Sequence, residues 1–169
     1  MAVDLKKTLD AYQAKRGVFR IVEIPAMRYL MIDGAGDPNS APEYAHAVTA
    51  LFSLAYTLKF ASKKQLGIDT VVMPLEGQWH APDMESFTTQ RDKSAWFWTL
   101  MIMIPDHVTD EMFAAAVDAV AKKKDASPSL SSVRFETLDE GLCVQTLHIG
   151  SYDDEAPVLA SMHDEFIPA

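Results

Sequence analysis

Residues 95–104 read Ala-Trp-Phe-Trp-Thr-Leu-Met-Ile-Met-Ile, and this stretch decides the fold. The side chains of a strand alternate between its two faces. One face would therefore carry Trp96, Trp98, Leu100 and Ile102, and the other would carry Phe97, Met101 and Met103. Because both faces are apolar, we expect a central strand of a sheet, with other elements packed on each side.

The neighbouring stretch, residues 70–80, reads Thr-Val-Val-Met-Pro-Leu-Glu-Gly-Gln-Trp-His. Its β-branched and apolar start predicts a second strand, which would form a long-loop hairpin with residues 95–104. One carboxylate, Glu76, lies in the middle of this strand and close to Trp79. A carboxylate among apolar and aromatic side chains is costly unless it is paired or useful. Two interpretations stay open: Glu76 ends the strand and points to water, or it lies in a ligand pocket with aromatic walls.

The rest of the chain predicts an α+β fold around this hairpin. A helix should begin near Pro42 and end at Gly67, because proline is favoured in a first helical turn and glycine just after a last one. A second helix should begin at Thr109 and carry Lys122–Lys124 in its last turn, where the helix dipole favours cations. The other expected elements are a helix or arm at 3–16, strands at 19–24 and 28–32, a hairpin of 133–138 with 142–149, and a final helix.

Two segments share one pattern. Residues 19–34 and 135–150 both read as strand, break, strand and glycine, and each is followed by an acidic loop with a proline and then a helix. The pattern predicts two pseudo-symmetric units in a single domain: a first repeat at 17–105, a helix and linker at 106–132, and a partial second repeat at 133–169.

The second repeat ends inside its helix, so it lacks the hairpin that the first repeat has at 70–104. A bare strand edge in the second repeat would be a liability. We therefore expect either a homodimer that covers this edge or a chain shortened from a longer parent.

Composition narrows the class of protein. The chain has 169 residues, 49% of them hydrophobic, and a net charge of −9, which fits a globular domain and disfavours binding to nucleic acid. No apolar run is long enough for a transmembrane helix, and the polar first residues do not resemble a signal peptide. The single cysteine, Cys143, fits a reducing cytoplasm. The five histidines show no metal-ligand spacing, and we expect no metal and no cofactor.

Five segments together resemble a known family. They are Tyr29-Leu-Met-Ile-Asp-Gly-Ala-Gly-Asp-Pro-Asn39, Leu54-Ala-Tyr-Thr-Leu-Lys-Phe60, Met73-Pro-Leu-Glu-Gly-Gln-Trp79, Trp96-Phe-Trp98 with Met101-Ile-Met-Ile-Pro105, and Val144-Gln-Thr-Leu-His-Ile-Gly-Ser-Tyr-Asp-Asp-Glu155. In combination they resemble the GyrI-like small-molecule-binding superfamily, which is related to the effector-binding domains of multidrug-sensing transcription regulators. The subgroup most similar to this chain is the stand-alone cyclopropanoid cyclopropyl hydrolases.

The resemblance implies duplicated β-α-β-β units, with antiparallel strands, helices on one side and an aromatic cleft at the pseudo-twofold axis. It implies that Glu76 is the acid in this cleft. The wall residues that it implies are Trp79, Trp96, Trp98 and Tyr152, with Tyr56 and Glu155 as further ligand-binding candidates. We therefore expect Trp96 or Trp98 to face the cleft and Phe97, between them, to face the helices, because a strand alternates sides.

Two functions follow from the resemblance. In the first, Glu76 is the general base of a detoxifying hydrolase that opens the strained ring of DNA-alkylating compounds and so confers drug resistance. In the second, the protein binds lipophilic, often cationic compounds without chemistry, and sequesters or senses them. A weaker third hypothesis is inhibition of another protein by an acidic surface.

Overall fold

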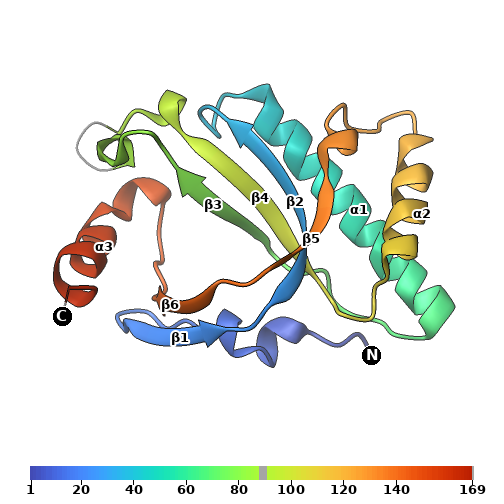
Figure 1. Ribbon diagram of the computed structural model, residues 1–169, viewed down its shortest axis with the longest axis horizontal. Coiled ribbons are helices and arrows are strands. Elements are labelled where there is room, and N and C mark those ends of the chain that lie inside the picture. Colours follow the sequence, from blue (N-terminus) through green and yellow to red (C-terminus); the bar gives the residue numbers. More distant parts are fainter. Residues whose placement is uncertain (88–90, 169) are drawn as a thin grey trace. The chain divides into compact units, whose positions relative to one another are not determined.

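A computed structural model gives the structure of the chain, and it describes residues 1–87 and 91–168. The strands and helices are β1 (Arg20–Ile24), β2 (Met27–Ala35), α1 (Pro42–Leu66), β3 (Leu75–His80), β4 (Phe97–Ile104), α2 (Asp110–Ala121), β5 (Arg134–Leu138), β6 (Gly141–Gln145) and α3 (Ala156–Ala160) (Figure 1). The predicted mixture of helices and antiparallel strands is confirmed. The chain divides into two compact units, which we call the sheet unit (Met1–Leu5 and Met27–Leu138) and the terminal unit (Lys6–Ala26 and Asp139–Ala169).

The sheet unit is built on an antiparallel sheet with the strand order β3-β4-β2-β5. β4 is an inner strand, and its residues from Trp98 to Ile104 are all buried, as the apolar pattern on both faces predicts. β3 pairs with β4, which confirms the long-loop hairpin. β3 begins only at Leu75, because Pro74 has no N–H for a strand ladder. The residues before Pro74 instead meet the N-terminus, where the Val71 N–H donates to the Val3 carbonyl at 2.8 Å.

Both helices of the sheet unit cover the same face of the sheet (Figure 1). α1 begins with Pro42 in its first turn, and Gly67 ends it with a φ of 71°, a left-handed conformation that favours glycine. The predicted bounds of α1 are thus confirmed. α2 begins after Thr109, whose hydroxyl accepts a hydrogen bond from the Met112 N–H at 3.2 Å. Phe113 of α2 packs on Phe135 of β5, with ring centroids 5.3 Å apart.

The indole of Trp98 points toward the helices. Its ring meets Tyr44 of α1 edge-on at 5.3 Å, and Trp98 is only 1% exposed. Gly34, its cross-strand partner on β2, makes room for this ring, because a Cβ at Gly34 would lie 2.0 Å from it. Phe97 points the other way and stacks on His80 at 5.5 Å. The prediction that Phe97 faces the helices is therefore wrong.

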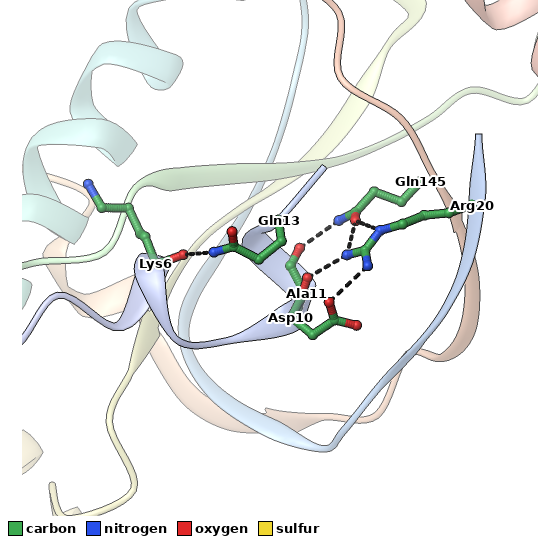
Figure 2. A network of polar contacts seen from close by, with 6 residues as sticks. All are labelled: Lys6, Asp10, Ala11, Gln13, Arg20 and Gln145. Atoms are coloured by element: carbon green, nitrogen blue, oxygen red, sulfur yellow. Dashed lines mark hydrogen bonds and ion pairs between the residues drawn. The ribbon is translucent and has the colours of Figure 1, made fainter. Parts of the chain in front are cut away.

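The terminal unit contains a two-stranded antiparallel sheet of β1 and β6. Figure 2 shows how Arg20 of β1 fastens this sheet to the N-terminal turns. The guanidinium of Arg20 donates to the Gln145 side chain at 2.7 and 2.9 Å and to the Asp10 carboxylate at 2.8 Å. Gln145 in turn donates to the Ala11 carbonyl at 2.5 Å. The expected helix or arm at 3–16 is built from short turns at Leu5–Lys7 and Asp10–Tyr12.

The expected hairpin of 133–138 with 142–149 is not formed. β5 pairs with β2, whereas β6 pairs with β1 in a separate sheet. Each strand of the predicted second repeat thus pairs with a strand of the first. In the predicted repeat, β1 corresponds to β5 and β2 corresponds to β6. The β1–β6 pair therefore corresponds to the β5–β2 pair. The duplication and its boundaries stay a prediction.

Candidate functional site

The face of the sheet opposite to the two helices of the sheet unit, α1 and α2, is the candidate site. Trp98 points to the helices. Alternation along each strand, together with the register between the strands, then shows to which face of the sheet each of the other side chains points. We call this surface the helix-free face; it carries Tyr29, Met31, Asp33, Glu76, Gln78, His80, Phe97, Thr99, Met101, Met103, Arg134 and Glu136.

Glu76 stands at one end of a row that crosses all four strands of the sheet. Its cross-strand partner is Met101 on β4, Met101 is opposite Met31 on β2, and Met31 is opposite Arg134 on β5. Neighbouring strands lie about 4.8 Å apart, so the row spans roughly 14 Å. Both methionines are buried and Glu76 is half-buried. An acid therefore stands at one end of the row and an arginine at the other, and the two methionines between them form a polarisable apolar floor.

Arg134 is held in place by two acids. Its guanidinium makes hydrogen bonds of 2.8 and 3.2 Å to the two carboxylate oxygens of Asp33 and one of 3.2 Å to Glu136. The Thr99 hydroxyl also donates to Asp33, at 2.6 Å. Burial alone would raise the pKa of Asp33, but the hydrogen bonds from Thr99 and Arg134, with the charges of Arg134 and His80, outweigh burial and lower this pKa. Asp33 therefore stays ionised and orients Arg134.

The three predicted indoles gather on the other side of the hairpin. Trp79 and Trp96 meet edge-on at 5.7 Å, and Trp79 also stacks with Tyr44 of α1 at 6.3 Å. Trp96 stacks on Phe87 at 4.9 Å and donates from its Nε1–H to the Ser86 carbonyl at 3.1 Å. Trp79 is 38% exposed, whereas Trp98 is part of the core. The sheet lies between this aromatic cluster and Glu76, so the cluster does not wall the acid.

The other predicted ligand-binding residues belong to other elements of the chain. Tyr56 is on the outer side of α1, where it lines a groove with Phe52 and Phe60, and not on the helix-free face. Tyr152 and Glu155 belong to the terminal unit. Tyr152 is 83% exposed in a short turn at Tyr152–Asp154, and Glu155 precedes α3 and accepts hydrogen bonds from Val158 and Leu159 with its backbone carbonyl. The ligand-binding roles of all these residues stay predictions.

Residues 1–87 and 91–168 contain no group of three or more His, Cys, Asp or Glu side chains placed to hold a metal ion. Within the same residues, no helix is both long enough and apolar enough to cross a membrane. A small pocket between α1 and the end of β4 has a volume of about 20 Å³, which is room for about one water molecule and not for a drug-sized ligand.

Sequence reasoning found Glu76 but missed its surroundings. Asp33, Thr99 and Arg134 are far apart in the chain, and Asp33 lies just beyond the predicted strand at 28–32, whereas β2 continues to Ala35. Arg134 and Glu136 are two residues apart, which indicates that they share one face of their strand. This face can be placed beside Asp33 only when β5 is known to pair with β2. Nothing in the sequence alone shows that pairing.

A four-stranded antiparallel sheet backed by two helices places the chain in the class of α+β domains. The family model for GyrI-like small molecule binding domains matches residues 18–169, and the chain belongs to this family. No protein with a curated description shows significant similarity to the chain.

Three solved structures from Listeria innocua are similar to the chain. An uncharacterized conserved protein is 37% identical, with a TM-score of 0.83 over 96% of this chain and 79% of that protein. A structure described as a hydrolase is 35% identical, with a TM-score of 0.80 over 96% of this chain and 81% of its own. Another structure described as a hydrolase is 34% identical, with a TM-score of 0.81 over 97% of this chain and 80% of its own.

Proposed function

We propose that the protein binds flat, lipophilic small molecules on the helix-free face and hydrolyses cyclopropanoid, DNA-alkylating compounds, and so serves in detoxification. The observation that carries the proposal is the placement of Glu76 beside the buried Met101 and Met31, in one row with Arg134. The acid suits a reaction that begins with removal of a proton from water, and the methionine side chains beside it are polarisable and can adapt to a flat ligand. Family membership and the two similar structures described as hydrolases support the same reading.

In the proposed reaction, Glu76 takes a proton from a water molecule while the water oxygen bonds to a cyclopropane carbon. The strained carbon–carbon bond breaks, and its electron pair passes into the conjugated carbonyl of the ligand, which becomes a phenolate. The proton from Glu76 then completes the phenol. A donor must stabilise the developing negative charge, and the guanidinium of Arg134, at the other end of the row, is a cation on this face.

The test is a single-turnover assay with a cyclopropane-containing indole drug, read as loss of the cyclopropyl chromophore. Glu76→Gln should keep the fold and the affinity for the drug and should lower the rate about 10²- to 10⁴-fold, which is the usual contribution of a general base. Glu111→Gln is the matched control, since it makes the same change at an exposed acid of α2, away from the row of Glu76. Equal rates for Glu76→Gln and the wild type would reject Glu76 as the base.

Binding without chemistry is the second candidate, and one observation favours it. The floor is rich in methionine (Met31, Met101 and Met103), and methionine adapts its shape to varied ligands, as in promiscuous binding sites. The acids Asp33, Glu76 and Glu136 outnumber Arg134, which suits a cationic ligand. If calorimetry shows stoichiometric binding of the drug and the chromophore persists, the protein sequesters or senses its ligand and is not a hydrolase.

A further inference from the structure

The groove that contains Tyr56 lies on the solvent side of the helices, away from the helix-free face. Phe52, Tyr56 and Phe60 follow one another at intervals of four residues along α1, so they form one stripe on its surface. The rings of Phe52 and Tyr56 are 6.4 Å apart, and Tyr56 and Phe60 are 50% and 59% exposed. The groove along this stripe has a volume of about 370 Å³, within the range of small-molecule sites.

The polar groups of the groove have a defined arrangement. The hydroxyls of Thr49 and Thr57 donate to the helix backbone, to the carbonyls of Ala45 at 3.0 Å and Ser53 at 2.7 Å. Their donors are thus occupied. The charged group that remains at the groove is the ammonium of Lys123, which follows the C-terminus of α2. Lys123 has no ion-pair partner in the part of the chain that the structure describes, and none of the described lining residues is acidic.

The turn that carries Lys123 is fixed on α1. Its backbone N–H donates to the Val120 carbonyl at 3.0 Å, and the Ser127 hydroxyl donates across to the His46 carbonyl of α1 at 2.7 Å. The backbone that carries Lys123 is therefore fixed at one border of the aromatic stripe. A flat ring can stack on the exposed aromatic side chains, and a negative group on that ring can reach the lysine.

We propose that this groove is a second ligand site, separate from the helix-free face, which takes a flat aromatic molecule with one anionic group, such as an aryl carboxylate. Charge complementarity with Lys123 selects the anion, and the stripe of Phe52, Tyr56 and Phe60 selects the flat ring. The net charge of −9 opposes anions at long range. At physiological ionic strength, however, salt screens charges that lie more than about 8 Å apart. For an anion in the groove, the nearby charge of Lys123 therefore outweighs the net charge of the protein. The proposal does not depend on the reaction proposed for Glu76.

The test is a calorimetric titration with 2-naphthoate, compared with its neutral isostere 2-naphthamide, at physiological salt. We expect naphthoate to bind more tightly than naphthamide. Lys123→Gln should weaken naphthoate binding roughly two- to five-fold, as expected for an exposed charge pair, and should leave naphthamide unchanged. Lys124→Gln is the matched control, because it removes the same charge one residue away from the groove lining. Tyr56→Ala should weaken both ligands roughly tenfold.

Four results would overturn the proposal: no naphthoate binding at millimolar concentration, equal binding by Tyr56→Ala and wild type, equal effects of Lys123→Gln and Lys124→Gln, or equal affinity for the two ligands. Light scattering adds a further criterion. A dimer that Tyr56→Ala dissociates would show that a second copy of the chain occupies the groove. Tyr56 is half exposed, so its variants should keep the wild-type melting curve, and Phe60→Ala repeats the test if Tyr56→Ala does not fold.

Discussion

At the scale of single residues, Gly34 and Trp98 determine how closely the strands and α1 can approach. The indole of Trp98 lies over Gly34, and its Nε1–H is buried without a hydrogen-bond partner in the described part of the chain. An unpaired buried donor has a cost, and the packing of the ring on Tyr44 offsets it. The same ring makes glycine necessary on β2, although this glycine has ordinary strand geometry.

Gly34→Ala should therefore lower the free energy of unfolding by about 1–3 kcal/mol, because the new methyl group overpacks the core against the indole. Urea denaturation measures this loss. In a Trp98→Leu background the same substitution should cost much less, since the smaller side chain leaves space. An equal cost in both backgrounds would contradict the proposed contact.

A second prediction concerns Asp69, whose carboxylate forms ion pairs with two lysines. The ammonium groups of Lys59 and Lys63 lie 2.6 and 2.9 Å from its carboxylate, and their hydrogen bonds lower the pKa of Asp69 to about 2. A lowered pKa stabilises the fold above the unfolded pKa, near 3.8, and this stabilisation is lost as the pH falls through about 2.

Asp69→Asn should therefore be less stable than the wild type at pH 7, and the difference should shrink between about pH 4 and pH 2. Thermal melts at a series of pH values measure it. Asp139→Asn, at an exposed turn, is the control and should show no such pH-dependent difference. A constant difference down to pH 2 would show that the two lysines do not act through the charge of Asp69.

At the scale of elements, the sequence predicts what local chemistry dictates. Pro42 and Gly67 bound α1, and the doubly apolar stretch marks β4 as an inner strand. The pairing of β5 with β2 and of β6 with β1 could not be predicted, because it depends on contacts between distant segments. Nor does alternation say which face of β4 meets the helices. That choice rests on Gly34 and Tyr44, which no local pattern connects with Trp98.

The cross-strand contact between Thr99 and Asp33 gives a prediction at this scale. Thr99→Val removes the hydroxyl that donates to Asp33 at 2.6 Å, so the pKa of Asp33 should rise toward its ordinary value. Carboxyl-detected NMR titration measures this pKa. Thr57→Val, whose hydroxyl donates to the backbone of α1, is the control and should leave Asp33 unchanged. An unaltered titration of Asp33 in Thr99→Val would show that β4 does not orient this acid.

At the scale of the whole molecule, the chain belongs to the GyrI-like family, and we propose that Glu76 supplies its chemistry. The sequence pointed to Glu76 because it is the one acid of residues 70–80, but it grouped Glu76 with indoles that the sheet places on its other side. A homodimer stays a prediction, and size-exclusion chromatography with light scattering tests it. A monomer at all protein concentrations would reject it.

The central claim is that Glu76 activates water on the helix-free face, and a single-turnover reaction in water enriched in oxygen-18 tests it most directly. With a cyclopropane-containing indole drug, the wild type should give a ring-opened product that carries one labelled oxygen. Glu76→Gln should bind the drug equally well and form this product about 10²- to 10⁴-fold more slowly. A labelled product formed by Glu76→Gln at the wild-type rate, or a wild-type product without the label, would contradict the account.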